Sequence, residues 1–241
     1  IDLETHRTVF TWVLQCLGIA GLIKGKTLAI DATTLEANAA LRSIVRRDTG
    51  ESYNECLTKL AKESGIETPT RADLAKLDRK RKKKGSNQDW EHRYDPDARI
   101  AKMKDGRTHL AHKAEHAVDL ETGAVVAVTL AAGNTGDTAT ILETLPQAGE
   151  HIAEVACATN NEEVGERVHP EGPVEAVGDK GYHSNATLTA LAGATVRTYS
   201  SEPDRGRRRW TGQPEEQAAV YGNRRRIRGQ HGKELLRRRG E

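Results

Sequence analysis

Residues Val174 to Ser200 read VEAVGDKGYHSNATLTALAGATVRTYS, and this stretch decides the fold class. A short apolar run begins at Val174 and stops at Asp179, a helix capped by Ser184 follows, and a second short strand ends the stretch. Strands that are joined through a helix run parallel. The stretch therefore predicts an α/β protein with parallel strands.

Two further stretches add strands to this sheet. KTLAID, from Lys26 to Asp31, is a short apolar strand that also ends at a carboxylate. From Arg107 apolar and polar residues alternate, a turn follows at Gly123, and VVAVTLAAG returns as a second strand, which predicts an antiparallel hairpin. Together with the opening stretch, these patterns predict a mixed five-stranded sheet flanked by helices.

A charged segment separates the first strand from the hairpin. Residues 51–84 carry apolar residues three and four positions apart among many charges, which is typical of helices. We interpret residues 42–98 as a charged helical insertion after the first strand rather than as core. With this insertion, residues 1–241 are expected to form one domain.

The C-terminal segment, residues 197–241, is basic. It holds thirteen Lys and Arg residues against six Asp and Glu residues, whereas the whole chain has a formal net charge of +2. Residues 214–239 have the spacing of a long helix, interrupted near Gly229 and Gly232. A basic end on a near-neutral chain favours a polyanionic partner, most often nucleic acid.

Cysteine spacing and hydropathy narrow the class of protein. Cys16, Cys56 and Cys157 form no CxxC pair, which argues against a zinc ribbon or a disulfide framework and favours a reducing cytosol. No apolar run reaches the length of a membrane span, and charged residues interrupt the mildly apolar residues 1–22. We therefore expect a cytoplasmic protein without a membrane partner.

Two of the predicted strands end at an aspartate, Asp31 and Asp179. Strand ends can lie side by side in a mixed sheet, and open α/β sheets bind ligands at such ends. Neighbouring carboxylates repel each other unless a cation lies between them, and Mg²⁺ prefers oxygen ligands of this kind. The pair therefore predicts a magnesium site, whereas either aspartate alone would indicate only a solvated turn.

Other polar residues favour structural roles. His109, His112 and His116 lie on one predicted strand, but His109 points to the opposite face, which argues against a shared metal site. Asp137 could be a metal ligand, but its GDTAT context favours a helix cap at Asp137 or Thr138.

Several motifs, in order, resemble those of a known family. They are TLAIDATTLEANAA around Asp31, RYDPDARIAKMKDGRTHLAHKAEHAVDLETGAVVAV over the hairpin, GNTGDTATI at the next helix, AVGDKGYHSNATL around Asp179, and NRRRIRGQHGKELLRRRGE at the end. The chain resembles a bacterial insertion-sequence transposase with a DDE catalytic domain on an RNase H-like fold, over nearly its whole length. The resemblance implies an enzyme that cuts and rejoins DNA at element ends by metal-assisted phosphoryl transfer.

The resemblance also implies a set of catalytic residues. Asp31 and Asp179 match the first two acidic ligands, which would hold two Mg²⁺ ions, with Mn²⁺ as an alternative. Glu241 is the nearest candidate for the third catalytic acid, although the matching family residue would lie beyond it. The family's N-terminal DNA-binding region would precede Ile1, so the resemblance implies a chain truncated at both ends.

DNA is the partner that the resemblance implies, both as element end repeats and as target DNA. It further implies a protein of the bacterial nucleoid and a homodimer in the active complex. Basic residues after Asp179 and in the C-terminal segment would contact DNA phosphates. The candidates are Lys180, His183, Arg207, Arg208, Arg209, Arg224, Arg225, Arg226, Arg228, Arg237 and Arg238.

Two other functions stay open at this point. The chain could be an inactive DNA-binding remnant of a transposase, which predicts salt-sensitive DNA binding without strand cleavage. It could also be a structure-selective nuclease on the same fold, which predicts cleavage of branched DNA without end repeats and without strand joining.

Overall fold

The computed structural model describes residues 2–81, 85–103, 105–158, 164, 167–169, 171–204, 206 and 208–240. The chain separates into two compact units. Unit 1 comprises Ile1–Ala32, Glu115–Thr129 and Gly136–Glu241, and unit 2 comprises Thr33–Ala114 and Leu130–Thr135.

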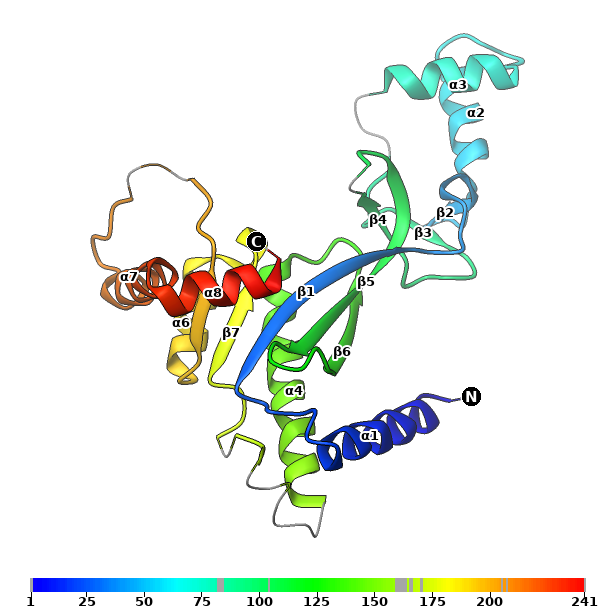
Figure 1. Ribbon diagram of the computed structural model, residues 1–241. Helices are drawn as coiled ribbons and strands as arrows, with labels where there is room; N and C mark the ends of the chain where they lie inside the picture. Colours follow the sequence, from blue (N-terminus) through cyan, green and yellow to red (C-terminus); the bar gives the residue numbers. More distant parts are fainter. Residues whose placement is uncertain are drawn as a thin grey trace. The chain divides into compact units, whose positions relative to one another are not determined.

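The main sheet is mixed, as predicted. Its strands are β1 (Thr27–Glu36), β4 (Arg99–Lys102), β5 (Thr108–Asp119), β6 (Val125–Ala132), β7 (Glu175–Gly178) and β8 (Arg197–Ser200). Over the described residues these six strands have the order β4-β5-β1-β7-β8, with β6 paired to β5 (Figure 1). β7 pairs in parallel with both β1 and β8, and β4 is antiparallel to β5. The helix-linked strands of the opening stretch are therefore parallel neighbours, as predicted.

The predicted number of five strands is wrong by one. The additional strand, β4, escapes the sequence pattern because only Ala101 among its four residues is buried. Its backbone nevertheless pairs with β5, from Arg99 opposite Ala111 to Lys102 opposite Thr108. Pairing of backbone groups, rather than alternation of side chains, makes this segment a strand.

The first strand, β1, is longer than its apolar run. Its first four residues, Thr27 to Ile30, are buried, but the strand continues through Asp31 to Glu36. The predicted strand end at Asp31 is therefore wrong, because backbone pairing continues after the buried side chains stop. In contrast, β7 ends at Gly178, so Asp179 follows its strand directly, as predicted.

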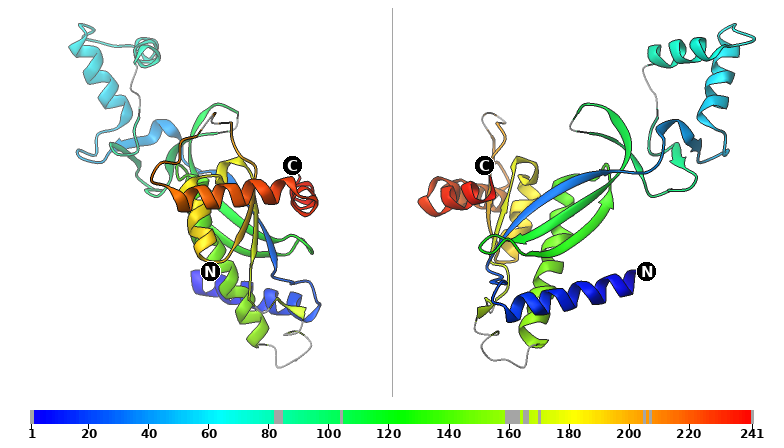
Figure 2. Two further views of the ribbon diagram at one scale, coloured as in Figure 1. Left: turned by 90° about the vertical axis from the view of Figure 1, so that its left-hand side faces the viewer. Right: turned by 45° about the vertical axis from the view of Figure 1, so that its right-hand side comes forward.

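Helices cover both faces of β7 in unit 1. They are α1 (Leu3–Ile19), α4 (Asp137–Ala158), α6 (Asn185–Gly193), α7 (Pro214–Arg228) and α8 (Gln230–Arg239), and a short 3-10 turn, η2, spans Lys180–Tyr182. Ala176 packs in the large core with side chains of α1 and α4, whereas Val177 packs with Leu235 of α8. Because neighbouring strand residues face opposite sides, α4 and α8 lie on opposite faces of β7 (Figures 1 and 2).

Local signals place the ends of these helices. Ser184 caps α6 as predicted, since its Oγ accepts the backbone N–H of Thr187 at 3.0 Å. The predicted interruption of the basic helix falls at Gly229, between α7 and α8. Gly232 permits the close packing of the two helices, because an added Cβ would come closer than 3.0 Å to backbone atoms of Arg226.

Unit 2 contains residues 42–98, the predicted helical insertion. Its elements besides the main-sheet strands are the 3-10 turn η1 (Leu41–Ser43), β2 (Ile44–Arg46), α2 (Tyr53–Glu63), α3 (Arg71–Lys80) and β3 (Trp90–His92). Capping boxes at Ser52 and Thr70 start α2 and α3. The antiparallel pair of β2 and β3 has no counterpart in the sequence analysis. A small core that includes Ile44, Tyr53 and Trp90 joins this pair to α2.

Two observations concern the cysteines and the apolar character of the helices. Cys16, Cys56 and Cys157 are free thiols. Within the part of the chain that the structure describes, no helix has both the length and the apolar character to cross a membrane.

Candidate active site

The two predicted metal ligands, Asp31 and Asp179, follow the paired segments of two neighbouring strands. β1 and β7 pair in parallel from Thr27 opposite Glu175 to Ala29 opposite Val177. Asp31 and Asp179 each lie two residues beyond the last of these pairs. Because neighbouring parallel strands lie about 4.8 Å apart, the chain carries both aspartates at the same end of this strand pair.

Asp31 faces α8, the helix that packs on Val177 of β7. The side chain of Asp31 is 72% exposed. Arg239, in the last turn of α8 and only 10% exposed, brings its Nη2 to 3.4 Å from Asp31 Oδ1. The helix thus supplies a cation to one member of the aspartate pair.

A third carboxylate, that of Asp137, lies near Asp179. Asp137 is the first residue of α4, and the carbonyl oxygen of the preceding Gly136 accepts the N–H of Thr140. The predicted cap at Asp137 or Thr138 is therefore wrong by at least one position. An added Cβ at Gly181 would come closer than 3.0 Å to both Asp137 Oδ2 and Asp179 Oδ1. The N–H of Gly181 also donates to Asp179 Oδ1 at 2.7 Å. The turn after β7 therefore leaves only the space of a glycine between two carboxylates.

The donor atoms of this site suit a hard divalent cation. Mg²⁺ binds oxygen ligands and is usually held by one or two carboxylates, together with water and substrate phosphates. Asp31 and Asp179 offer two carboxylates at one end of the strand pair. Among the described residues, no group of three or more His, Cys, Asp or Glu side chains is arranged to hold a metal ion. Glu241, the sequence candidate for the third acid, lies outside the described residues.

A buried carboxylate, Glu115 on β5, supports the turn that follows β7. It is 1% exposed, and its Oε1 accepts hydrogen bonds from Tyr182 Oη at 2.9 Å and from Thr140 Oγ1 at 2.5 Å. Its Oε2 accepts a hydrogen bond from Thr144 Oγ1 at 2.5 Å. Burial, followed by the charge of Glu115, raises the pKa of Tyr182 far above its usual range. The phenol therefore stays protonated and donates its hydrogen bond at any physiological pH.

The two basic candidates next to Asp179 differ in accessibility. Lys180 is exposed on η2, where its ammonium group can reach a phosphate. His183 is 0% exposed. No part of its imidazole is therefore available at the surface for direct contact with DNA.

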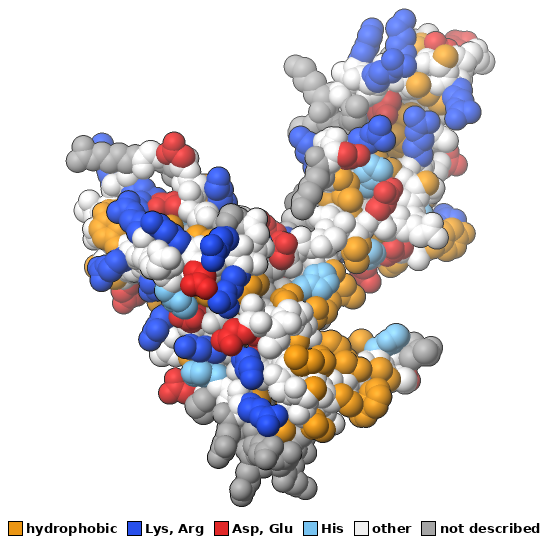
Figure 3. All heavy atoms as spheres, in the orientation of Figure 1, with side chains coloured by type: hydrophobic (Ala, Val, Ile, Leu, Met, Phe, Trp, Pro, Cys, Tyr) orange, Lys and Arg blue, Asp and Glu red, His pale blue; other side chains and the backbone are white. Residues whose placement is uncertain are grey.

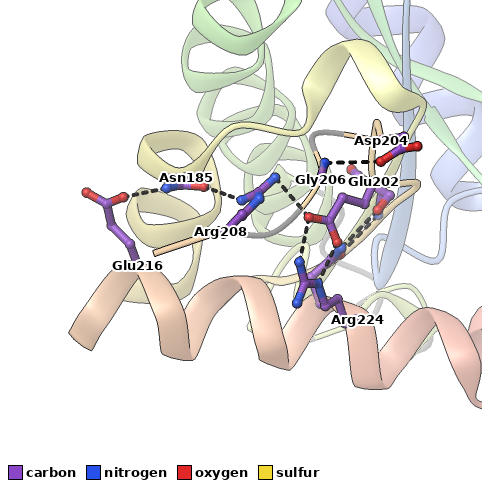
Figure 4. Close-up of polar contacts among 9 residues, drawn as sticks. Asn185, Glu202, Asp204, Gly206, Arg208, Glu216 and Arg224 are labelled. Carbon is purple, nitrogen blue, oxygen red and sulfur yellow. Dashed lines mark hydrogen bonds and ion pairs between the residues drawn. The ribbon is translucent and has the colours of Figure 1, made fainter. Parts of the chain in front are cut away.

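Three arginines predicted to contact DNA are engaged inside the protein. Arg208 and Arg224 converge on Glu202: Arg208 Nη2 lies 2.8 Å from Oε1, and Arg224 Nε lies 2.5 Å from Oε2 (Figure 4). The hydrogen bond from Arg224 holds the pKa of Glu202 below its ordinary value. Arg226 Nε donates to the carbonyl oxygen of Thr198 at 3.0 Å, and burial lowers the pKa of Arg226. These contacts tie the basic loop and β8 to α7.

The remaining described candidates are exposed. Figure 3 shows Lys and Arg side chains gathered over α7 and α8. Arg238 pairs with Glu234 one helical turn away at 2.8 Å, a surface pair of small energetic value. Arg207 lies outside the described residues. The exposed candidates are Arg209, Arg225, Arg228, Arg237 and Arg238.

Two of the three histidines on the first hairpin strand, both in unit 2, have separate carboxylate partners. His109 Nδ1 lies 2.5 Å from Glu36 Oε1, and His112 Nε2 lies 3.0 Å from Asp95 Oδ2. The contact with His112 lowers the pKa of Asp95. Each imidazole is thus paired with its own carboxylate.

Sequence reasoning missed two charged residues of this region, Glu115 and Arg239. Glu115 carried a signal, because it is a carboxylate on the inward-facing side of an alternating strand, next to Ala117. Asp137 was considered as a metal ligand, but its context favoured a role at the start of a helix, where it lies in α4. Nothing local distinguishes Arg239 from its arginine neighbours, because its contact with Asp31 depends on how α8 packs across the sheet.

Comparisons with protein-family models, with curated proteins and with solved structures find no match for this chain. The function is therefore argued from the residues and from the geometry of the site.

Proposed function

We propose that this chain is the catalytic domain of a DDE-type DNA transposase with an RNase H-like fold. It would cut DNA at the ends of a mobile element and join them to target DNA. The parallel pairing of β1 and β7 carries the proposal, because Asp31 and Asp179 both lie two residues beyond its last pair, at the same end of the two strands. The mixed order of the sheet is compatible with this fold, and the motifs around both aspartates resemble those of the family.

In the proposed site, Asp31 and Asp179 share the binding of Mg²⁺ or Mn²⁺, as one ion or two. Such ions, when bound, activate an attacking water or 3′-hydroxyl and stabilise the leaving oxygen. The exposed arginines of α7 and α8 bind DNA phosphates, so affinity for DNA falls as salt concentration rises.

The test is a titration of the full chain with Mn²⁺ by calorimetry, in the parent protein and in Asp31→Asn and Asp179→Asn. We expect the parent to bind Mn²⁺ and both variants to lose this binding, because each amide removes one of the two negative charges. Asp204→Asn is the matched control: Asp204 Oδ1 accepts the N–H of Gly206 at 3.1 Å, in the same turn geometry as Asp179 and Gly181. Equal Mn²⁺ affinity in Asp179→Asn and the parent would refute the proposed site.

Cleavage assays in Mg²⁺ separate the alternative functions. A transposase cuts DNA that carries the element's end repeats and joins the new 3′ ends to a second DNA. Cleavage of branched DNA without end repeats would indicate a structure-selective nuclease. Salt-sensitive DNA binding without any cleavage would indicate an inactive remnant.

A further inference from the structure

The buried carboxylate of Glu115 connects three elements around the candidate site. Its partners are Thr140 and Thr144 on α4 and Tyr182 on η2, while Glu115 itself lies on β5. A buried charge is costly unless hydrogen bonds satisfy it. Three hydroxyl donors meet this demand and tie the start of α4 and the turn after β7 to a single carboxylate.

Tyr182 connects the carboxylate of Glu115 to the backbone around Asp179. The ring of Tyr182 packs directly on Gly178, where an added Cβ would lie 3.0 Å from the ring atom Cδ2. The N–H of Tyr182 donates to the carbonyl oxygen of Asp179 at 3.3 Å. The turn is thus clamped on both sides of Asp179, at Gly178 by the ring and at Tyr182 by the phenol.

Glu115 is also connected, through α4, to Asp137, the other carboxylate near this turn. Asp137 begins α4, and Thr140, which donates to Glu115, lies one turn further along that helix. Gly181 packs against both Asp137 and Asp179. Movement of either α4 or η2 relative to β5 would therefore change the separation of these two carboxylates.

We propose that Tyr182 and Glu115 are positioning residues that hold Asp179 in place for binding of a divalent cation. The inference rests on the proposed function. A buried hydrogen-bonded charge adds little stability compared with an apolar replacement, so its main effect here is on geometry. Partners behind the direct ligands commonly change metal affinity by about 10- to 100-fold.

The chain contains a matched control for this pair. Tyr199 Oη donates to Glu175 Oε1 at 2.9 Å, the same donor, acceptor and distance as in the pair of Tyr182 and Glu115. Both tyrosines are buried. Tyr199 lies on β8, outside the turn that carries Asp179. Tyr182→Phe and Tyr199→Phe therefore remove the same hydrogen bond at two places.

The experiment measures Mn²⁺ affinity by calorimetry and the thermal unfolding midpoint of both variants and of the parent. We expect similar losses of Tm in the two variants, and an Mn²⁺ affinity about tenfold lower only in Tyr182→Phe. Equal Mn²⁺ affinity in the parent and Tyr182→Phe would overturn the inference, as would an equal loss in both variants. If Tyr182→Phe does not fold, Thr140→Val replaces it, because this variant removes another hydrogen-bond donor to Glu115. An unchanged Mn²⁺ affinity in Thr140→Val would then overturn the inference.

The failure of the inference differs from the failure of the proposed function. If the parent protein binds no Mn²⁺, both fail, and the loss of Tm in Tyr182→Phe reports only a structural hydrogen bond. If the parent binds Mn²⁺ through Asp31 and Asp179 but Tyr182→Phe binds it equally well, only the positioning role fails.

Discussion

At the scale of single residues, Gly181 is the most constrained position of the candidate site. Its N–H holds Asp179 Oδ1, and its Cα lies where any side chain would meet the carboxylates of Asp137 and Asp179. The sequence DKGY therefore does more than form a turn. Its glycine allows two carboxylates to share one small space.

Gly181→Ala is expected to weaken Mn²⁺ binding with little change in the free energy of unfolding, because the new methyl group displaces the carboxylate ends of Asp137 and Asp179 at an exposed position. The measurement is calorimetric Mn²⁺ titration together with urea unfolding. Gly193→Ala, in the last turn of α6, is the control, since an added Cβ there meets nothing within 4 Å. Retention of the parent's Mn²⁺ affinity in Gly181→Ala would contradict the close packing of the two carboxylates.

Arg239 has a different relation to the site, because its guanidinium lies beside Asp31. A cation in this place competes with a metal ion for the same carboxylate. Arg239→Ala is therefore expected to tighten Mn²⁺ binding by about two- to tenfold, which corresponds to about 0.4–1.4 kcal/mol. Arg238→Ala, which removes only a surface pair with Glu234, should leave Mn²⁺ affinity unchanged. Weaker binding in Arg239→Ala would show that the arginine supports the site instead.

At the scale of elements, some arginines of α7 make contacts inside the protein and others are exposed. Arg224 and Arg226 face inward and bind Glu202 and Thr198, whereas Arg225 and Arg228 are exposed. The helical period does not explain the division, because Arg224 and Arg228 are four residues apart and share one face of the helix. Arg224 and Arg226 are held instead by acceptors outside α7, the carboxylate of Glu202 and the carbonyl oxygen of Thr198. Arginine density alone therefore overestimates the surface that can contact DNA.

Arg228→Ala and Arg224→Ala should distinguish an effect on DNA binding from an effect on folding stability. Arg228→Ala is expected to reduce the slope of log affinity for DNA against log salt by about 1, with an unchanged Tm. Arg224→Ala is expected to cost about 1–2 kcal/mol of folding stability, because Glu202 loses one of its two arginine partners. Fluorescence anisotropy at several salt concentrations and thermal unfolding measure the two effects. A lower Tm in Arg228→Ala with no change of salt slope would reverse the assignment.

At the scale of the whole molecule, each unit contains a buried tyrosine hydrogen-bonded to a carboxylate. Burial, followed by the hydrogen bond to Asp78, raises the pKa of Tyr53 in unit 2 from 10.0 to about 12. Burial, followed by the hydrogen bond to Glu175, raises the pKa of Tyr199 in unit 1 from 10.0 to about 12. A raised folded-state pKa means that the folded protein retains the proton to higher pH than the unfolded chain.

Both units are therefore expected to lose stability in the same alkaline window. The contribution of each tyrosine is complete below pH 10 and is lost as the pH rises from 10 towards 12. Urea unfolding at a series of pH values up to 12 measures this loss. Tyr53→Phe and Tyr199→Phe, which cannot ionise, should flatten the profile, and an unchanged profile in the double variant would contradict the prediction.

The sequence by itself determined the features that depend on neighbours along the chain. Spacing and caps predicted the strand that ends before Asp179, the cap at Ser184 and the break at Gly229, because each depends on residues only a few positions apart. The parallel arrangement of β7 and β8 followed from the helix between them. β4 and the second half of β1 were missed, because their backbones pair without a buried side-chain pattern.

The tertiary structure alone decided which distant residues meet. The register that brings Asp31 and Asp179 to the same end of two neighbouring strands is a property of the contact between β1 and β7, where Thr27 Oγ1 also donates to Glu175 Oε2 at 2.7 Å. The approach of Arg239 to Asp31 likewise depends on the packing of α8. Local sequence indicates where an apolar strand or a capped helix begins, but packing between elements fixes their register, and this register brings two separate aspartates to one candidate site.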